Sequence, residues 1–351
     1  MPYEVSKNGS YKFTITGTVG GKTYSLEYTV AVNQYKVKTP QVGDIVDYKP
    51  DTPSTGYDLS TAKSGDDVQT IDGRYDPTTW KIMEVDENGN ITKLFGVPSS
   101  SQRTVFFQGS TGYNNGVYLL NDICKSRYGN ASLGATARSL NIEDIESRMN
   151  SNGIAARNGY KAGTVQYGTT KTFTGSNAKY PAIYAQEKYS GVDVSDVADG
   201  TQVITGSVNA TAQAKMNPNG KSGSDDIYTT LPETSETTGP SKTNLICTQT
   251  YYNVSQSSSY YDDSNFYSMI FGTETFFWLA SRCVNCSSNY SYADFQLHTV
   301  SYSSLRGNYL LYSNGGSIGC NGRLAPVVSL GSGVQIKSGE GTTEKPYVIG
   351  K

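Results

Sequence analysis

Residues 286–302, CSSNYSYADFQLHTVSY, constrain the fold more than any other stretch of the chain. Phe295 and Leu297, followed by Val300, are apolar, whereas the residues between them are mostly polar. Successive side chains of a strand point to opposite faces, so this pattern predicts a strand with one face in a core. The polar residues expected on its other face are Asp294, Gln296 and His298. The flanks are crowded with Tyr, Ser and Asn, which neither fill a core nor make an ordinary solvated surface.

Tyrosine dominates the aromatic residues, with 28 Tyr against 10 Phe and 2 Trp. Its ring has a rigid apolar body and a polar tip, which suits a surface that is wet when free and buried when bound. Secreted β-rich proteins are also rich in Tyr, Ser, Thr and Asn for solubility alone. The net charge is only −2. Because phosphate binding needs a concentrated positive field, we expect no nucleic-acid partner.

No stretch approaches the roughly 20 consecutive apolar residues that cross a bilayer, so we expect no direct membrane insertion. The N-terminus, MPYEVSKNGSYKF, lacks the charged and apolar regions of a signal peptide. We therefore expect a fragment whose export or anchoring segment is missing.

The cysteines do not form an even framework for disulfides. Cys283-x-x-Cys286 has the spacing of half a zinc site, but the chain has a single histidine and no second half. Free thiols or a local disulfide are the simpler interpretations. Acidic pairs such as Asp66-Asp67 and Asp225-Asp226 lie in polar loops, where they are more often solvated than bound to calcium. We expect no metal and no cofactor. The five cysteines are Cys124, Cys247, Cys283, Cys286 and Cys320.

Residues 3–35 contain three alternating runs separated by Asn8-Gly9 and Gly20-Gly21. Such dipeptides provide the positive φ angles of tight hairpin turns. This segment resembles the last strands of a bacterial immunoglobulin-like domain. The resemblance implies that residues 1–38 form a partial immunoglobulin-like β segment that acts as a spacer.

Three further elements are predicted between residues 79 and 150. Ile82 and Leu94 lie in alternating runs on either side of Asn88-Gly89, which predicts a hairpin. A helix at about 114–128 would bury one face at spacings of three and four. A second helix at 141–149 would begin at an Asn141 cap. The residues expected to be buried by the two helices are Val117, Leu120, Cys124, Tyr128, Ile142, Ile145 and Met149.

Residues 151–250 are rich in Gly, Ser, Thr and Asn and have few periodic apolar runs. They are interpreted as a long irregular insertion with short strands. Regular structure resumes with ETFFWLASR and continues through RLAPVVSL to PYVIG.

Residues 283–324 contain no Lys, Glu, Met or Trp, and a single Gln, Gln296. Lys and Glu are depleted from recognition surfaces because ordering their flexible side chains costs entropy. The remaining mixture of Tyr, Ser, Gly and Asn is typical of antibody paratopes. This composition favours a binding surface on a strand whose other face is fixed in a core, over an ordinary β surface whose tyrosines pack on one another.

FFWLASR, the Tyr-, Asn- and Ser-rich run after it and the closing RLAPVVSL together resemble the C-terminal part of a C-type lectin fold. More narrowly, they are similar to the variable proteins of diversity-generating retroelements, whose lectin fold is of the formylglycine-generating-enzyme type. In that family, adenines of AAC and AAT codons are randomised, which cannot produce Lys, Glu, Met or Trp. Gln296 departs from this pattern. The resemblance covers roughly residues 40–351, including GYNNGVYLLNDIC and ARSLNIEDIE, and is most specific at 276–330.

The resemblance implies an α+β fold, with one C-type lectin-like domain over residues 39–351. That domain would contain small antiparallel sheets, two helices, the irregular insertion at 151–250 and a variable region at 283–324. Trp278, Phe295, Leu297 and Val327 should be buried.

The implied function is a hypervariable ligand- or receptor-binding protein outside the cell, on a bacterial surface or a phage particle. Its partner would be a variable protein or carbohydrate on another cell surface, and the oligomeric state stays open. The alternatives are a structural adhesin domain with fixed glycan specificity and a formylglycine-generating-type cysteine oxidase. We expect no enzyme, because three of the cysteines lie in the variable region and His298 has no assignable nucleophile. The expected ligand-binding residues are Tyr290, Tyr292, Asp294, His298, Tyr302, Arg306, Asn308, Tyr309, Tyr312 and Asn321.

Overall fold

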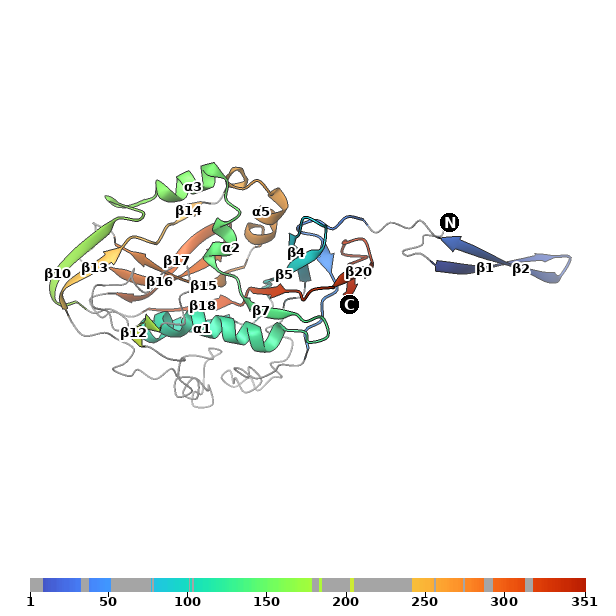
Figure 1. Ribbon diagram of the computed structural model, residues 1–351, viewed down its shortest axis with the longest axis horizontal. Helices are drawn as coiled ribbons and strands as arrows, with labels where there is room; N and C mark the ends of the chain where they lie inside the picture. Colours follow the sequence, from blue (N-terminus) through green and yellow to red (C-terminus); the bar gives the residue numbers. More distant parts are fainter. Residues whose placement is uncertain are drawn as a thin grey trace.

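The structure is a computed structural model with mixed α+β architecture, as expected. In Figure 1 a body of sheets and helices stands apart from an N-terminal hairpin. The described residues are 9–32, 38–51, 77, 79–100, 102, 104–178, 183–184, 203–204, 242–255, 257–273, 275–286, 293–312 and 318–351.

The larger sheet of the body has six strands in the order β14-β17-β16-β15-β18-β6. Its pairs are antiparallel, except that β15 meets β18 in parallel at Phe277 and Arg323. Both faces of β16, the strand predicted from residues 286–302, are buried. The strand bounds are β6 Thr104–Gln108, β14 Val254–Ser255, β15 Phe277–Asn285, β16 Asp294–Ser301, β17 Ser304–Tyr312 and β18 Gly319–Arg323.

A second sheet has five strands in the order β3-β4-β5-β19-β7. The hairpin predicted around Asn88-Gly89 is confirmed as β4–β5, and Gly89 has a φ of +82°. The bounds are β3 Ile45–Val46, β4 Thr79–Val85, β5 Ile91–Val97, β7 Thr136–Ser139 and β19 Pro326–Ser329.

Four smaller strand pairs complete the described β structure of the body. They are β8 Lys161–Ala162 with β9 Val165–Gln166, β10 Thr170–Ala178 with β13 Lys242–Thr248, β11 Ile183–Tyr184 with β12 Val203–Ile204, and β20 Gln335–Ser338 with β21 Val348–Gly350.

Helix α1 (Gly109–Tyr128) packs on the larger sheet and closes the first hydrophobic core. Its predicted face is confirmed, since Val117, Leu120, Cys124 and Tyr128 are all buried. A side chain at Gly116 would meet Leu297 of β16 at 2.5 Å, so this glycine allows the helix to lie close to the sheet.

Helix α2 (Ile142–Glu146) helps to close a second core on the other side of β16. The predicted Asn141 cap is confirmed: its side chain accepts a hydrogen bond from the Asp144 amide, and Asp144 accepts one from the Asn141 amide. Both Asp144 oxygens also accept from Arg138 at 2.6 Å. The residues predicted to be buried here, Ile142, Ile145 and Met149, are buried.

Both cores combine residues from distant parts of the chain. The first contains Leu94 and Trp278, and the second contains Ile145 and Phe277. The indole N–H of Trp278 donates to the Val105 carbonyl at 2.8 Å, which ties β15 to β6. The four residues predicted to be buried, Trp278, Phe295, Leu297 and Val327, are each 0% exposed.

The prediction of two helices is wrong, because the described residues contain further helices. Helix α3 (Ser151–Asn158) is capped by Asn150 and opens the region predicted to be irregular. Helix α5 (Ser264–Phe271) is capped by Asp263 and buries Phe266, Met269, Ile270 and Phe271 in the second core. A short 3-10 turn, η6 (Ser258–Tyr260), precedes α5.

The N-terminal hairpin consists of β1 (Gly9–Val19) and β2 (Lys22–Val32). The predicted turn is confirmed, with φ angles of +60° at Gly20 and +77° at Gly21. The first of the three predicted runs begins before residue 9 and lies largely outside the described residues.

Candidate binding face

Strand β17 holds the candidate site residues on a backbone that is fixed by buried neighbours. Leu305, Leu310 and Leu311 are buried in the two cores. Between them, Arg306 is exposed and Asn308 is half-buried. Strand β17 pairs with β16 along its length, and with β14 at Ser304 and Leu305. Its outward side chains can therefore vary without removing the residues that hold the strand in place.

Strand β18 adds Asn321 to the same region. The Asn308 side-chain amide donates to the Cys320 sulfur at 2.9 Å, and the Ile318 amide donates to the Leu310 carbonyl at 2.9 Å. These contacts place the start of β18 beside β17. Asn321 is exposed, whereas a side chain at Gly322 would meet the Trp278 ring at 2.7 Å. Asn308 thus contacts Cys320, the residue that precedes Asn321 in β18.

Tyr309 and Tyr312 lie at one end of β17 with their ring centroids 6.1 Å apart. Both are half-buried, so part of each ring is available to a ligand. Tyr290 and Tyr292, predicted for the same surface, lie outside the described residues.

Tyr302 lies at the opposite end of β17, in the turn from β16. Its side chain is 70% exposed. Tyr302 and Ser303 have φ angles of +45° and +64°, the left-handed region that side-chain-bearing residues rarely adopt. The Ser303 hydroxyl donates to the Phe271 carbonyl at 3.0 Å and anchors the turn to α5. The backbone therefore presents Tyr302 to solvent in a strained conformation.

The prediction that Asp294 and His298 lie on the exposed face is wrong, because each is only 2% exposed. They share one face of β16 with Gln296, and Tyr251 and Tyr252 cover that face. The Tyr252 and His298 rings are 5.5 Å apart. A side chain at Gly307 would meet the Tyr251 ring at 2.7 Å, so this glycine lets the covering segment approach the sheet.

A second tyrosine layer supports the cover over β16. Tyr160 packs edge-on against Tyr251 at 5.7 Å, and Tyr167 against Tyr252 at 5.8 Å. Tyr160 and Tyr167 come from the region predicted to be an irregular insertion. One sequence signal could have indicated the cover: Val300 lies on the same face of β16 as His298, and an apolar residue there indicates burial.

Burial perturbs both titratable groups under this cover. Desolvation raises the pKa of Asp294 to about 7, opposed by a 3.0 Å hydrogen bond from the Asn285 amide. Desolvation lowers the pKa of His298 to about 4, so the imidazole is neutral at pH 7. Oδ1 of Asp294, Nε2 of Gln296 and Nδ1 of His298 have no hydrogen-bond partner among the described residues. These groups form a buried polar layer that a ligand at the surface would not touch.

The cysteines with described side chains are unpaired. Cys283 and Cys286 are buried, and burial raises the pKa of the Cys283 thiol well above its usual range. A buried neutral thiol is a poor nucleophile. Within the described ranges, no group of three His, Cys, Asp or Glu residues could hold a metal ion. Among the described helices, none is long and apolar enough to cross a membrane.

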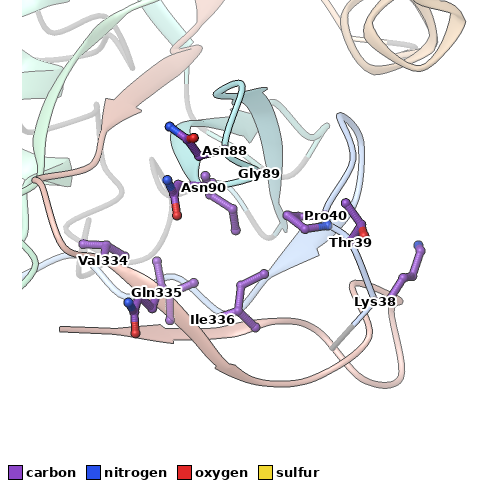
Figure 2. Close-up of a pocket in the computed structure, with 11 residues that line it drawn as sticks. Lys38, Thr39, Pro40, Asn88, Gly89, Asn90, Val334, Gln335 and Ile336 are labelled. Carbon is purple, nitrogen blue, oxygen red and sulfur yellow. The ribbon is translucent and has the colours of Figure 1, made fainter. Parts of the chain in front are cut away.

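A cavity of about 380 Å³ lies away from this surface, between Lys38–Pro40, the β4–β5 turn and β20. Figure 2 shows Asn88, Asn90 and Gln335 at its edge. Ile91, Val334, Ile336 and Ile349 give it an apolar lining. None of the predicted ligand-binding residues lines this cavity.

The predicted residues that keep exposed area are Tyr302, Arg306, Asn308, Tyr309, Tyr312 and Asn321, and this set is called the candidate face. It wraps around β17: the register places Arg306 and Asn308 on the side of Thr299 and Leu297, and Tyr309 and Tyr312 on the side of Gln296 and Asp294. No family model, curated protein or solved structure matches the chain.

Proposed function

We propose that this chain is a ligand-binding protein whose recognition surface is the candidate face on β17 and β18. One observation carries the proposal: in β17 the exposed or half-buried residues 306–309 and 312 are held between leucines that are buried in the cores, Leu305 before them and Leu310 and Leu311 within them. Such a strand separates the residues that maintain the fold from the residues that meet a partner.

The chemistry of the face supports a protein or carbohydrate ligand. Tyr309 and Tyr312 offer rigid aromatic area, Arg306 offers a planar set of donors, and Asn308 and Asn321 offer amide donors and acceptors. At interfaces, aromatic and Arg side chains of this kind dominate the binding energy, with losses of about 2 kcal/mol or more on truncation.

We further propose that the surface is hypervariable and that the chain is a retroelement variable protein with a C-type lectin-like domain over residues 39–351. On this proposal, residues 1–38 are an immunoglobulin-like spacer, and the protein is displayed on a bacterial surface or a phage particle. The absence of Lys, Glu, Met and Trp from residues 283–324 supports the proposal. So does the placement of Tyr, Asn and Ser at the exposed positions of that region.

The binding proposal is tested by probing the chain on arrays of glycans and of purified bacterial surface proteins. Arg306→Ser should weaken binding to any partner found, and Lys337→Ser, an exposed cation of β20 outside the face, should not. Equal loss in both variants, or none in either, would contradict the assignment of the face.

Hypervariability is tested separately in the nucleotide sequence. The proposal expects a near-copy of the codons for residues 283–324 that differs only at adenines, beside a reverse transcriptase gene. Binding with no such copy would favour a fixed-specificity adhesin.

A further inference from the structure

The N-terminal hairpin has two chemically opposite faces. Cross-strand partners of an antiparallel pair project to the same side, so the register assigns every residue to a face. One face carries the apolar pairs Tyr11–Val30, Phe13–Tyr28 and Ile15–Leu26, with Tyr24 and Val19 beyond them. The other face carries Ser10–Ala31, Lys12–Thr29, Thr14–Glu27, Thr16–Ser25 and Thr18–Thr23, in which Ala31 is the one apolar residue.

Most of the apolar face is open to solvent, and Tyr11 and Phe13 at its start are half-buried. Its exposed fractions are 59% at Ile15, 72% at Val19, 61% at Tyr24, 56% at Leu26, 48% at Tyr28 and 46% at Val30. Within the described part of the chain, β1 and β2 form a sheet of their own, and Figure 1 shows them extending away from the body. A two-stranded hairpin is at best marginally stable alone, and a contiguous exposed apolar patch marks an interaction site.

We infer that this face is a self-association surface on which the hairpin of a second copy of the chain packs face to face. Two-fold contacts require a surface that complements itself. The apolar face meets this requirement in charge, because its one charged residue, Lys22, lies at the turn and two copies do not repel each other along the rest of the face.

The shape of the face also favours a second copy. Gly17 is the cross-strand partner of Tyr24, and a side chain there would meet no atom within 4 Å. Gly17 therefore leaves a gap in the apolar row, flanked along β1 by Ile15 and Val19 and faced across the hairpin by Tyr24. An aromatic ring of the second copy fits this gap, and the gap of that copy receives a ring in return.

The size of the face sets the strength of the dimer. Each strand has 11 residues. A hairpin of that length presents a face about 36 Å long and about 10 Å wide. Two such faces with their protruding side chains would remove on the order of 1,000 Å² from water, near the lower limit for specific association. The dimer should therefore be weak and should depend on concentration. This inference does not depend on the proposed ligand-binding function.

Sedimentation velocity of the whole chain, from about 1 μM to about 100 μM, tests the inference. We expect a shift from monomer to dimer over this range. Ile15→Lys, on the apolar face, should keep the chain monomeric at the highest concentration. Its matched control Thr16→Lys, one residue along on the polar face, should dimerise like the parent. A monomeric parent throughout the range, or equal behaviour of the two variants, would overturn the inference.

A cross-linking experiment keeps the inference testable if Ile15→Lys unfolds the hairpin. With a short bifunctional maleimide, Ile15→Cys should yield covalent dimers well above the parent background. Thr16→Cys should yield no more than that background, because its thiol points away from the second copy. Equal cross-linking of the two variants would overturn the face-to-face arrangement.

Discussion

At the scale of single residues, the structure contains two energetically unfavourable features, referred to below as conflicts. Tyr302 occupies a left-handed conformation while exposing its ring, and Asp294 and His298 are buried with polar atoms that lack partners. The first conflict belongs to the candidate face and the second to the layer beneath the tyrosine cover. Each leads to a measurable consequence for stability.

Replacing Tyr302 with Gly should stabilise the fold, because glycine adopts positive φ without steric cost. A residue with a side chain costs about 1–2 kcal/mol in this conformation, and glycine avoids that cost. Because glycine also loses more backbone entropy on folding, the net gain in stability should be about 0.5–1 kcal/mol. Chemical denaturation measures the change. Tyr302→Ala is the control and should show no such gain. A gain of the same size in Ala would mean that removal of the exposed ring, and not the backbone, is responsible.

Asp294→Asn should change the pH dependence of stability in a defined direction. The pKa of Asp294 is about 7 in the folded chain, above its unfolded value of about 3.9, so the folded state binds the proton more tightly. Asp294 therefore makes the wild-type chain lose stability as the pH rises from about 4 to 7. The variant, relative to wild type, should gain stability over that window, on the order of a few kcal/mol.

His298→Gln should show the opposite sign. The folded pKa of His298 is about 4, below its unfolded value of about 6.5, so stability is lost as the pH falls through that window. In the wild type the two residues oppose each other between pH 4 and 6.5. Denaturation midpoints measured across this pH range in both variants and the wild type show how stability changes with pH in each protein. Parallel curves for wild type and variants would contradict the burial of these groups.

At the scale of elements, helix α1 and strand β16 depend on each other through one contact. Gly116 brings the helix close enough for Leu297 to pack beneath it.

The periodicity of α1, the Asn141 cap of α2 and the β4–β5 hairpin could be predicted because their signals are local. Helices α3 and α5 were missed, although Asn150 and Asp263 are ordinary helix caps. Helix α5 is only eight residues long, too short for periodicity alone to identify it.

Gly116→Ala should destabilise the protein, although helix propensity alone favours alanine by about 1 kcal/mol. The added carbon would lie 2.5 Å from the Leu297 Cδ1 atom, and overpacking of this kind costs about 1–3 kcal/mol. Thermal unfolding measures the loss. In the Leu297→Val background the same change should cost less, because the valine leaves room for the new carbon. Identical costs in the two backgrounds would exclude this contact as the cause.

At the scale of the whole molecule, the sequence predicted a hydrophobic core and a tyrosine-rich surface. The structure divides the tyrosines into an exposed group and a buried group. Tyr302, Tyr309 and Tyr312 keep exposed area, whereas Tyr251 and Tyr252 are buried over β16. Composition could not make this division, because a tyrosine ring suits a core and a wet interface equally well. Asp294 and His298 were predicted to lie on the surface for a different reason, because polar side chains on one face of a strand are usually solvated.

The central claim is that the candidate face can change without unfolding the protein, and melting temperature measured together with binding on the same samples tests it most directly. Phe295→Ala should leave a core cavity that costs about 2–5 kcal/mol and lower the melting temperature markedly. Tyr309→Ser and Tyr312→Ser should leave the melting temperature within a few degrees of wild type while weakening the binding found on the arrays. If the two tyrosine variants lower the melting temperature as much as Phe295→Ala does, these tyrosines are core residues and the account is wrong.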